Sequence, residues 1–321
     1  MLWKIAFKNI LHKPLNAILC ITLLLFGTSI IALLLIIQDQ VTQKIEQDLQ
    51  NIDLVMGAKG SPLQLVLSSI YHLDSPTGNI NFSEAKKIMD GPMIEEAIPL
   101  AYGDNHKGYR ILGTTIAYLD KYNAKIAKGR IYQKSMETIL GADVSKKTGL
   151  QVGDTFFGTH GVAKKGHLHE SQFYKVVGIL QKSNTILDDL ILTTIESVWQ
   201  VHEPDNEHHH IERESKAEHQ QYTENNDKEI TAVLLKCKTK LAVLNTPRII
   251  NEQTNMQAVL PRLELNRLFY MFGIGTQTLK LIAGGIMTMA GFSVFFALYG
   301  RLKERRYELA LMRSVGYRII D

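Results

Sequence analysis

The sequence predicts an α+β fold in which two membrane-spanning helices flank a mixed domain of strands and helices. Two runs, residues 14–38 and 281–300, contain no charged residue. About 20 apolar residues in a helix match a hydrocarbon core about 30 Å thick, so each run is long enough to cross a membrane. Between them, short β-like runs alternate with helical patterns, which is typical of an α+β domain. The overall hydropathy of the 321-residue chain is near neutral, which fits a few membrane helices and a sizeable soluble domain.

Residues 1–13 predict an amphipathic helix that lies in the membrane interface on the cytoplasmic side. Trp3, Phe7 and Ile10 share one face, and the lysines of this segment lie on the others. Tryptophan favours the headgroup level of a bilayer, so Trp3 is placed there.

Residues 14–38 predict the first transmembrane helix. A cleaved signal peptide is the rival interpretation, but its apolar region is usually only about 7–15 residues long and ends at a small-residue cleavage site. Lysines precede the run and acidic residues follow it, so the positive-inside rule places the N-terminus in the cytoplasm. Residues 39–50 are expected to continue the helix as a stalk.

Residues 39–265 predict the extracytoplasmic domain. A strand at 52–56 and a helix at 63–71 are followed by a turn at 75–79. Ser83 is the expected N-cap of the next helix. The remaining strands are expected at 94–102, 109–115, 155–159, 173–180 and 230–237, and the remaining helices at 83–89, 141–148, 194–202 and 241–253.

Residues 203–229 form a polar, histidine-rich insert with few apolar side chains, which predicts a mobile segment. Neutral imidazoles bind zinc, copper or nickel, and several histidines in one loop can chelate a metal weakly. The solvated, charge-rich loop is the alternative. The candidate ligands for Zn²⁺ are His167, His169, His208, His209, His210 and His219.

Residues 266–300 predict a stalk followed by the second transmembrane helix, and residues 301–321 a basic cytoplasmic segment. The return to a basic flank agrees with the orientation of the first span. Small residues recur along the second span and would allow another helix to approach closely. These helix-packing candidates are Ala283, Gly284, Ala290, Gly291 and Ala297.

Catalysis by this chain is not expected. Asp188 and Asp189 are adjacent, so on a strand they would face opposite ways and make a poor acid–base pair. Ser68 and Ser69 lie near His72, but helical spacing alone often produces that arrangement. The chain contains no P-loop motif and no basic patch with interleaved aromatic residues outside the membrane flanks, so neither ATP nor nucleic acid is an expected ligand.

Several motifs resemble the MacB/FtsX-like permeases of ATP-binding cassette transporters. The pattern R-x-E-L-A-L-x-R-x-x-G follows the second span, and W-x-x-A-x-K-N opens the chain. The longest resemblance is DLVMGAKGSPLQLVLSSIYHLDSPTGN at residues 53–79. Shorter resemblances lie at 140–154 and 173–180, in the same order as in the family.

The resemblance implies a MacB-like periplasmic domain and a permease subunit that transmits motion from a cytoplasmic ATPase to that domain, for export or extraction of a substrate. The ATPase would bind ATP, and this chain would bind no cofactor. The family's ATPase-coupling element falls on Arg305, Arg306, Glu308, Leu309, Leu311, Arg313 and Gly316.

The resemblance also implies a place in the bacterial inner membrane, a homodimer or heterodimer of permeases, membrane lipid around the spans and a periplasmic partner. Family members usually have four spans, so the chain is expected to correspond to the N-terminal portion of such a permease. The alternatives are a two-span sensor or scaffold and a membrane-anchored metal-binding protein, each with an extracytoplasmic ligand domain.

Overall fold

The computed structural model describes residues 14–159, 173–202 and 228–304, together with Ala310 and Ser314. The chain divides into two compact units. The helical unit consists of residues 1–46 and 267–321, and the head domain consists of residues 47–266.

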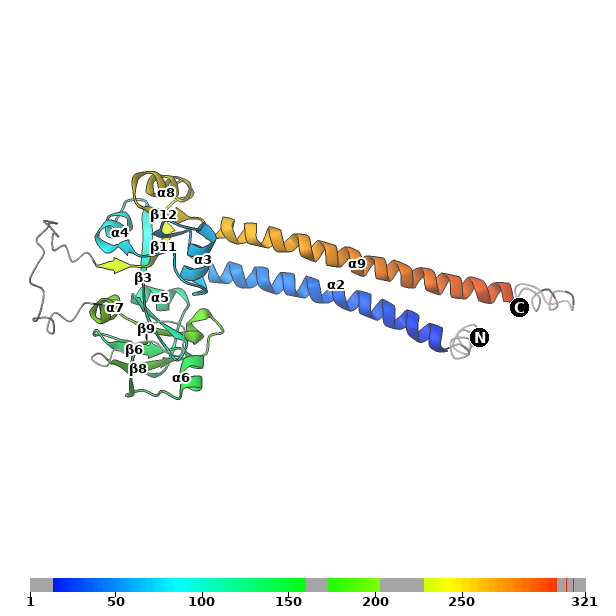
Figure 1. Cartoon of the computed structure of the whole chain (residues 1–321), viewed down its shortest axis with the longest axis horizontal. Helices are drawn as coiled ribbons and strands as arrows, with labels where there is room; N and C mark the ends of the chain where they lie inside the picture. The colour runs from blue at the N-terminus through cyan, green and yellow to red at the C-terminus, as the bar shows by residue number, and fades with distance from the viewer. Residues whose placement is uncertain (1–13, 160–172, 203–227, 305–309, 311–313, 315–321) are drawn as a thin grey trace, which may run out of the picture. The chain divides into compact units, whose positions relative to one another are not determined.

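The first long helix, α2 (Pro14–Asp48), joins the predicted first span to the predicted stalk without a break (Figure 1). Its 35 residues extend about 52 Å at 1.5 Å per residue, so about 20 Å of helix remains beyond a hydrocarbon core about 30 Å thick. The segment Leu25–Asp48 has a mean hydropathy of 1.6, and only 6% of its apolar window is buried. By length and composition, α2 can therefore anchor the chain in a membrane.

The second long helix, α9 (Pro261–Glu304), contains 44 residues and covers the whole predicted second stalk and span. Proline at its first position fits because the missing backbone N–H would have no partner there. The helix itself is therefore as expected, whereas its crossing of a membrane stays a prediction.

Within the helical unit, α2 and α9 meet at small residues. A Cβ on Gly27 would lie 2.7 Å from the Cγ of Met287 and 3.5 Å from the carbonyl oxygen of Ala283. Ala283 and Ala290 are buried, whereas Gly284 and Gly291 have no heavy atom within 4 Å of where a Cβ would stand. Two of the predicted packing residues, Ala283 and Ala290, are thus buried. Gly284 and Gly291 form an open strip on α9. The side chain of Ala297 is not among those that the structure describes.

The head domain contains a ten-stranded mixed sheet and a separate two-stranded sheet. The large sheet has the order β12-β1-β11-β3-β4-β9-β6-β8-β5, with β7 beside β8, and the small sheet pairs β10 with β2. The strands are β1 (Leu54–Ala58), β2 (Ile80–Asn81), β3 (Ile94–His106), β4 (Tyr109–Thr114), β5 (Ile126–Gly129), β6 (Glu137–Leu140), β7 (Thr155–Phe156), β8 (Tyr174–Leu180), β9 (Leu190–Thr193), β10 (Glu229–Ile230), β11 (Ala232–Cys237) and β12 (Met256–Val259).

The large sheet has two halves that share β3, one with β12, β1 and β11 and the other with β4, β9, β6, β8 and β5. Helices lie against the sheet in both halves (Figure 1). Strand pairs β4–β9 and β6–β8 are parallel, and the other pairs are antiparallel. The helices are α3 (Pro62–Ile70), α4 (Phe82–Met89), α5 (Ile116–Lys121), α6 (Ala142–Thr148), α7 (Ile195–His202) and α8 (Lys240–Gln253), with one 3-10 turn, η1 (Ile186–Asp189).

Strand β3 is shared by the two halves. Its first part pairs with β11 and its last part with β4, and Leu100 lies opposite both Ala232 and Thr114. One apolar core lies around Met56 and Val233, and a second lies around Ile111 and Val176. Helix α7 contributes to both of these described cores, with Ile195 and Val198 in the first and Val201 in the second.

The predicted helices and strands of the head domain occur in the predicted order, but β2, β5, β6, β9, β12 and α5 were not predicted, and three details need correction. Ser83 is not the N-cap of α4, because the Asn81 side chain accepts from the backbone N–H of Glu84 at 3.1 Å. The expected strand at 155–159 is shorter, ending at Phe156, and Thr159 forms only an isolated bridge to Asn105. Asp188 and Asp189 lie in η1 rather than on a strand.

Candidate functional site

A half-buried histidine that lies between two tyrosines is an unusual polar feature of the head domain. The Nδ1 of His72 lies 2.7 Å from the hydroxyl of Tyr102, and its Nε2 lies 2.7 Å from the hydroxyl of Tyr118. The three side chains come from the loop after α3, from β3 and from α5. They tie three separate elements together.

The local fold places His72 at the reversal that ends α3. Its φ of 54° lies in the left-handed region, and the N–H of Leu73 donates to the carbonyl oxygen of Leu67 at 3.1 Å. Glycine usually fills such a position, because a side chain there costs about 1–2 kcal/mol. The histidine ring offsets this cost through its two hydrogen bonds.

Burial lowers the pKa of His72 to about 3, and the nearby Arg110 acts in the same direction. The ring is therefore neutral at neutral pH, with one N–H and one lone pair. The Tyr102 hydroxyl donates to the carbonyl oxygen of Ser68. Because that hydroxyl uses its own proton for Ser68, it accepts from the Nδ1–H of His72. The Nε2 of His72 then carries the lone pair and accepts from the hydroxyl of Tyr118.

The network extends to the last turn of α2. The ring of Tyr118 packs against Tyr122 at 5.3 Å, and the Nζ of Lys121 lies 3.9 Å above the Tyr122 ring. The same Nζ donates to the carbonyl oxygen of Asp48 at 3.0 Å. Burial lowers the pKa of Lys121 to about 8. The end of α2 is thus connected through α5 and His72 to β3.

The segment 53–79, which resembles the permease family most closely, is held together by hydrogen bonds and packing contacts between its own residues. Gln64 donates from Nε2 to the carbonyl oxygen of Ser75 at 3.0 Å, and Thr77 donates from Oγ1 to that of Ala58, also at 3.0 Å. A Cβ on Gly57 would lie 2.5 Å from the Cδ1 of Leu65, so glycine lets α3 pack directly on β1. These contacts are a structural reason for the residue order, which the sequence alone did not supply.

No catalytic arrangement occurs among the described side chains that the sequence singled out. His72 bonds to tyrosines rather than to Ser68 or Ser69. Asp188 is buried and accepts from the N–H groups of Ser183 and Asn184, which stabilises a turn. In the described ranges, no group of three or more His, Cys, Asp or Glu side chains could hold a metal ion.

Two predicted sets of site residues lie outside the described residues. The first is the ATPase-coupling set, Arg305, Arg306, Glu308, Leu309, Leu311, Arg313 and Gly316. The second is the metal set, His167, His169, His208, His209, His210 and His219. Both remain predictions.

An apolar anchoring helix attached to a mixed α/β head domain defines the class of this protein. A family model, that of the MacB-like periplasmic core domain, matches residues 17–236. The chain therefore belongs to the family of MacB-like periplasmic core domains, which are parts of permeases of ATP-binding cassette transporters. The family predicted from the motifs is confirmed.

Two solved structures show what the chain is similar to. The periplasmic region of MacB from Actinobacillus actinomycetemcomitans is 9% identical with a TM-score of 0.43, covering 68% of this chain and 95% of its own. The extracellular domain of the noncanonic ABC-type transporter YknZ from Gram-positive bacteria is 10% identical with a TM-score of 0.38, covering 65% and 98%. No curated protein matches the chain.

Proposed function

We propose that this chain is a permease subunit of an ATP-binding cassette transporter and transmits motion from a cytoplasmic ATPase to a periplasmic head domain. Membership of the family supports the class of protein. ATP would bind to and be hydrolysed on a separate subunit, and the head domain would act on a substrate that is exported or extracted.

One observation carries the mechanical part of this proposal. Helix α2 ends five residues before β1, and α9 begins one residue after β12. These two strands pair with each other, with Val55 opposite Val259. Because both long helices are attached to neighbouring, hydrogen-bonded strands, a shift of one helix against the other acts directly on the sheet.

The proposal places the protein in the bacterial inner membrane with its N-terminus in the cytoplasm and residues 39–265 in the periplasm. A second permease, identical or related, and a periplasmic protein complete the assembly. The open strip of Gly284 and Gly291 on α9 suits a close approach by another helix in that assembly.

The coupling segment provides the test of the ATPase partner. The full chain carrying Glu308→Ala with Arg313→Ala should lose a P-loop ATPase that copurifies with the unchanged chain in mild detergent. The matched control is Glu84→Ala with Lys87→Ala on α4, which removes the same two charges from the head domain and should retain the ATPase. Absence of an ATPase from all three samples would refute the proposal and favour the two-span sensor or scaffold.

Zinc binding is a second candidate function, favoured by one observation. Thr159, just before the segment that carries His167 and His169, exchanges backbone hydrogen bonds with Asn105. The neighbouring His106 has a buried Nε2 with no partner among the described residues. The ring of Phe156 contacts that of His106, at 4.7 Å, and that of Tyr174, which follows the segment, at 5.5 Å. The segment thus starts and ends near a histidine that has an available lone pair.

Titration calorimetry of the full chain with Zn²⁺ would test this candidate. His167→Ala with His169→Ala should weaken binding at least about tenfold, which corresponds to 1.4 kcal/mol. A second variant with alanine at His208, His209, His210 and His219 shows whether Zn²⁺ binds to the insert instead of to the segment that carries His167 and His169. Equal affinity in every variant would show that neither set binds the metal.

A further inference from the structure

The two edge strands of the large sheet, β12 and β5, differ in whether their outer backbone groups have hydrogen-bond partners. At the β12 edge, the side chain of Asn251 donates to the carbonyl oxygen of Ala258 at 3.2 Å and accepts from its N–H at 2.7 Å. This amide closes the edge, as a further strand would. At the opposite edge, no described segment pairs with the outer side of β5, and Ala127 and Lys128 are exposed. An unpaired edge strand offers its N–H and C=O groups to another chain.

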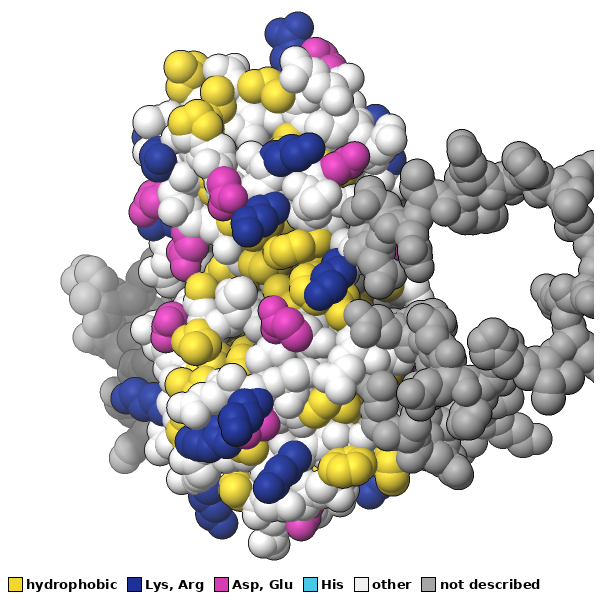
Figure 2. Space-filling model, turned by 90° about the vertical axis from the view of Figure 1, so that its left-hand side faces the viewer, with side chains coloured by type: hydrophobic (Ala, Val, Ile, Leu, Met, Phe, Trp, Pro, Cys, Tyr) yellow, Lys and Arg dark blue, Asp and Glu magenta, His cyan; other side chains and the backbone are white. Residues whose placement is uncertain are grey.

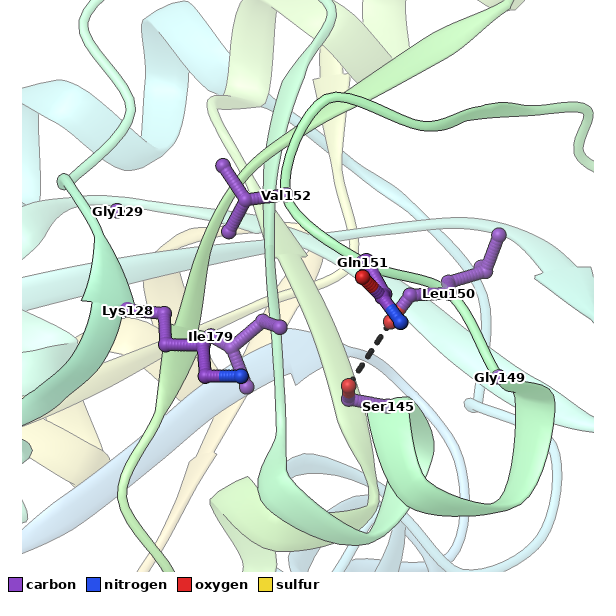
Figure 3. Close-up of a pocket in the computed structure, with 8 residues that line it drawn as sticks. All are labelled: Lys128, Gly129, Ser145, Gly149, Leu150, Gln151, Val152 and Ile179. Carbon is purple, nitrogen blue, oxygen red and sulfur yellow. Dashed lines mark hydrogen bonds between the residues drawn. The ribbon is translucent and has the colours of Figure 1, made fainter.

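A cavity of about 320 Å³ lies beside this open edge. Ile179 of β8 and Val152 supply apolar surface, and Lys128 and Gln151 extend into the space from opposite sides (Figure 3). Ser145 donates to the carbonyl oxygen of Leu150 at 2.9 Å and so holds the loop that forms one wall. A volume of this size suits one or two side chains of a bound peptide.

Lys128 is the one ionisable side chain among the residues that line the cavity, and the carboxylate of Asp154 accepts from the backbone N–H of Gln151 on the opposite wall. In this half of the head domain, three cations are used in ion pairs, Arg130 with Glu137, Lys147 with Asp189 and Lys182 with Asp143. Figure 2 shows another face of the protein, where Lys and Arg side chains are interspersed with Asp and Glu. The other described lysines between residues 107 and 182, each within 4.0 Å of no described carboxylate, are Lys107, Lys121, Lys125, Lys128, Lys134, Lys146 and Lys175.

We propose that the β5 edge and its cavity bind an extended acidic peptide segment of a partner protein. The segment would add a short strand to β5, and one of its carboxylates would enter the cavity and pair with Lys128. Main-chain hydrogen bonds supply affinity in this mode of recognition, and the side-chain pocket supplies specificity. The irregular register between Ile126 and Lys128 keeps the added strand short. The proposal does not depend on the ATPase partnership.

The test uses the full chain in nonionic detergent and a fluorescein-labelled hexapeptide of alternating glutamate and valine, followed by fluorescence anisotropy. Lys128→Glu should weaken binding at least about tenfold, because it replaces a charge-assisted hydrogen bond by repulsion between two carboxylates. Lys86→Glu on α4 makes the same charge change at an exposed site far along the sheet and should have little effect. A peptide with alternate N-methylated amides, which cannot complete a strand ladder, should bind at least about tenfold more weakly.

Three other results would each contradict one part of the proposed peptide site. Equal losses from Lys128→Glu and Lys86→Glu would mean that net charge alone attracts the peptide. Undiminished binding of the N-methylated peptide would rule out strand addition. A lysine–valine hexapeptide that binds as tightly, or no measurable binding of the acidic peptide, would reject the site altogether.

Discussion

Replacing His72 with leucine should lower the free energy of unfolding of the head domain by roughly 2–5 kcal/mol. The change removes the ring nitrogens that lie 2.7 Å from the hydroxyls of Tyr102 and Tyr118, and the Tyr102 hydroxyl keeps its bond to the carbonyl oxygen of Ser68. Each buried polar group without a partner costs about 1–3 kcal/mol. Urea unfolding of the full chain, followed by Trp199 fluorescence in a Trp3→Phe background, measures the loss.

A combined variant separates lost hydrogen bonds from lost packing. Adding Tyr102→Phe and Tyr118→Phe to His72→Leu removes the two hydroxyls and should recover a large part of the stability, because removing both partners of a hydrogen bond is far less costly than removing one. His106→Leu is the matched histidine control, since the ring of His106 makes one hydrogen bond among the described residues, from Nδ1 to the carbonyl oxygen of Phe157 at 2.9 Å. An unchanged urea midpoint for His72→Leu would show that the network does not stabilise the fold.

The head domain should lose stability as the pH falls from about 6.5 towards 3. His72 stays neutral in the folded domain because burial lowers its pKa to about 3, whereas a histidine in the unfolded chain takes up a proton near pH 6.5. The unfolded state binds more protons in this window, so stability decreases with decreasing pH by up to about 1.4 kcal/mol per unit. Stability from this group is fully present above pH 6.5.

Measurements between pH 7.5 and about 5 isolate this effect. The pKa of Glu137 is lowered to about 2, chiefly by its hydrogen bond with Arg130, so that carboxylate loses its contribution only below about pH 4.5. The pKa of His106 is also lowered by burial and acts in the same direction as His72. The slope of the unfolding free energy against pH gives the number of protons taken up on unfolding. For His72→Gln this number should be about one smaller than for the unchanged chain. Identical slopes would contradict a neutral His72.

Much of the fold could be predicted because periodicity is a local signal. The apolar run from residue 14, its stalk and most of the helices and strands of the head domain lie where the pattern placed them. The strands β2, β5, β6, β9 and β12 were missed because each has at most four residues, too few for alternation to be visible. Strand β9 is buried on all four residues, between β4 and β6, so it shows no polar face.

The network around His72 could not be predicted for a different reason. His72 is separated by 30 residues from Tyr102 and by 46 from Tyr118, and only the folded chain brings them together. Proximity in sequence suggested Ser68 and Ser69 as partners instead. The family, in contrast, could be recognised because the order of residues in segment 53–79 is a local property, and the contacts of Gly57, Gln64 and Thr77 now give that order a physical basis.

The pairing of β1 has a consequence for the order in which the protein matures. Strand β1 leaves the ribosome soon after α2, yet both of its neighbours, β11 and β12, are made about 180–200 residues later. The half of the sheet from β4 to β9 is complete within residues 109–193 and can condense first. Until β11 and β12 have been made, both edges of β1 lack their strand partners. The completion of this half of the sheet is therefore one of the last steps of folding.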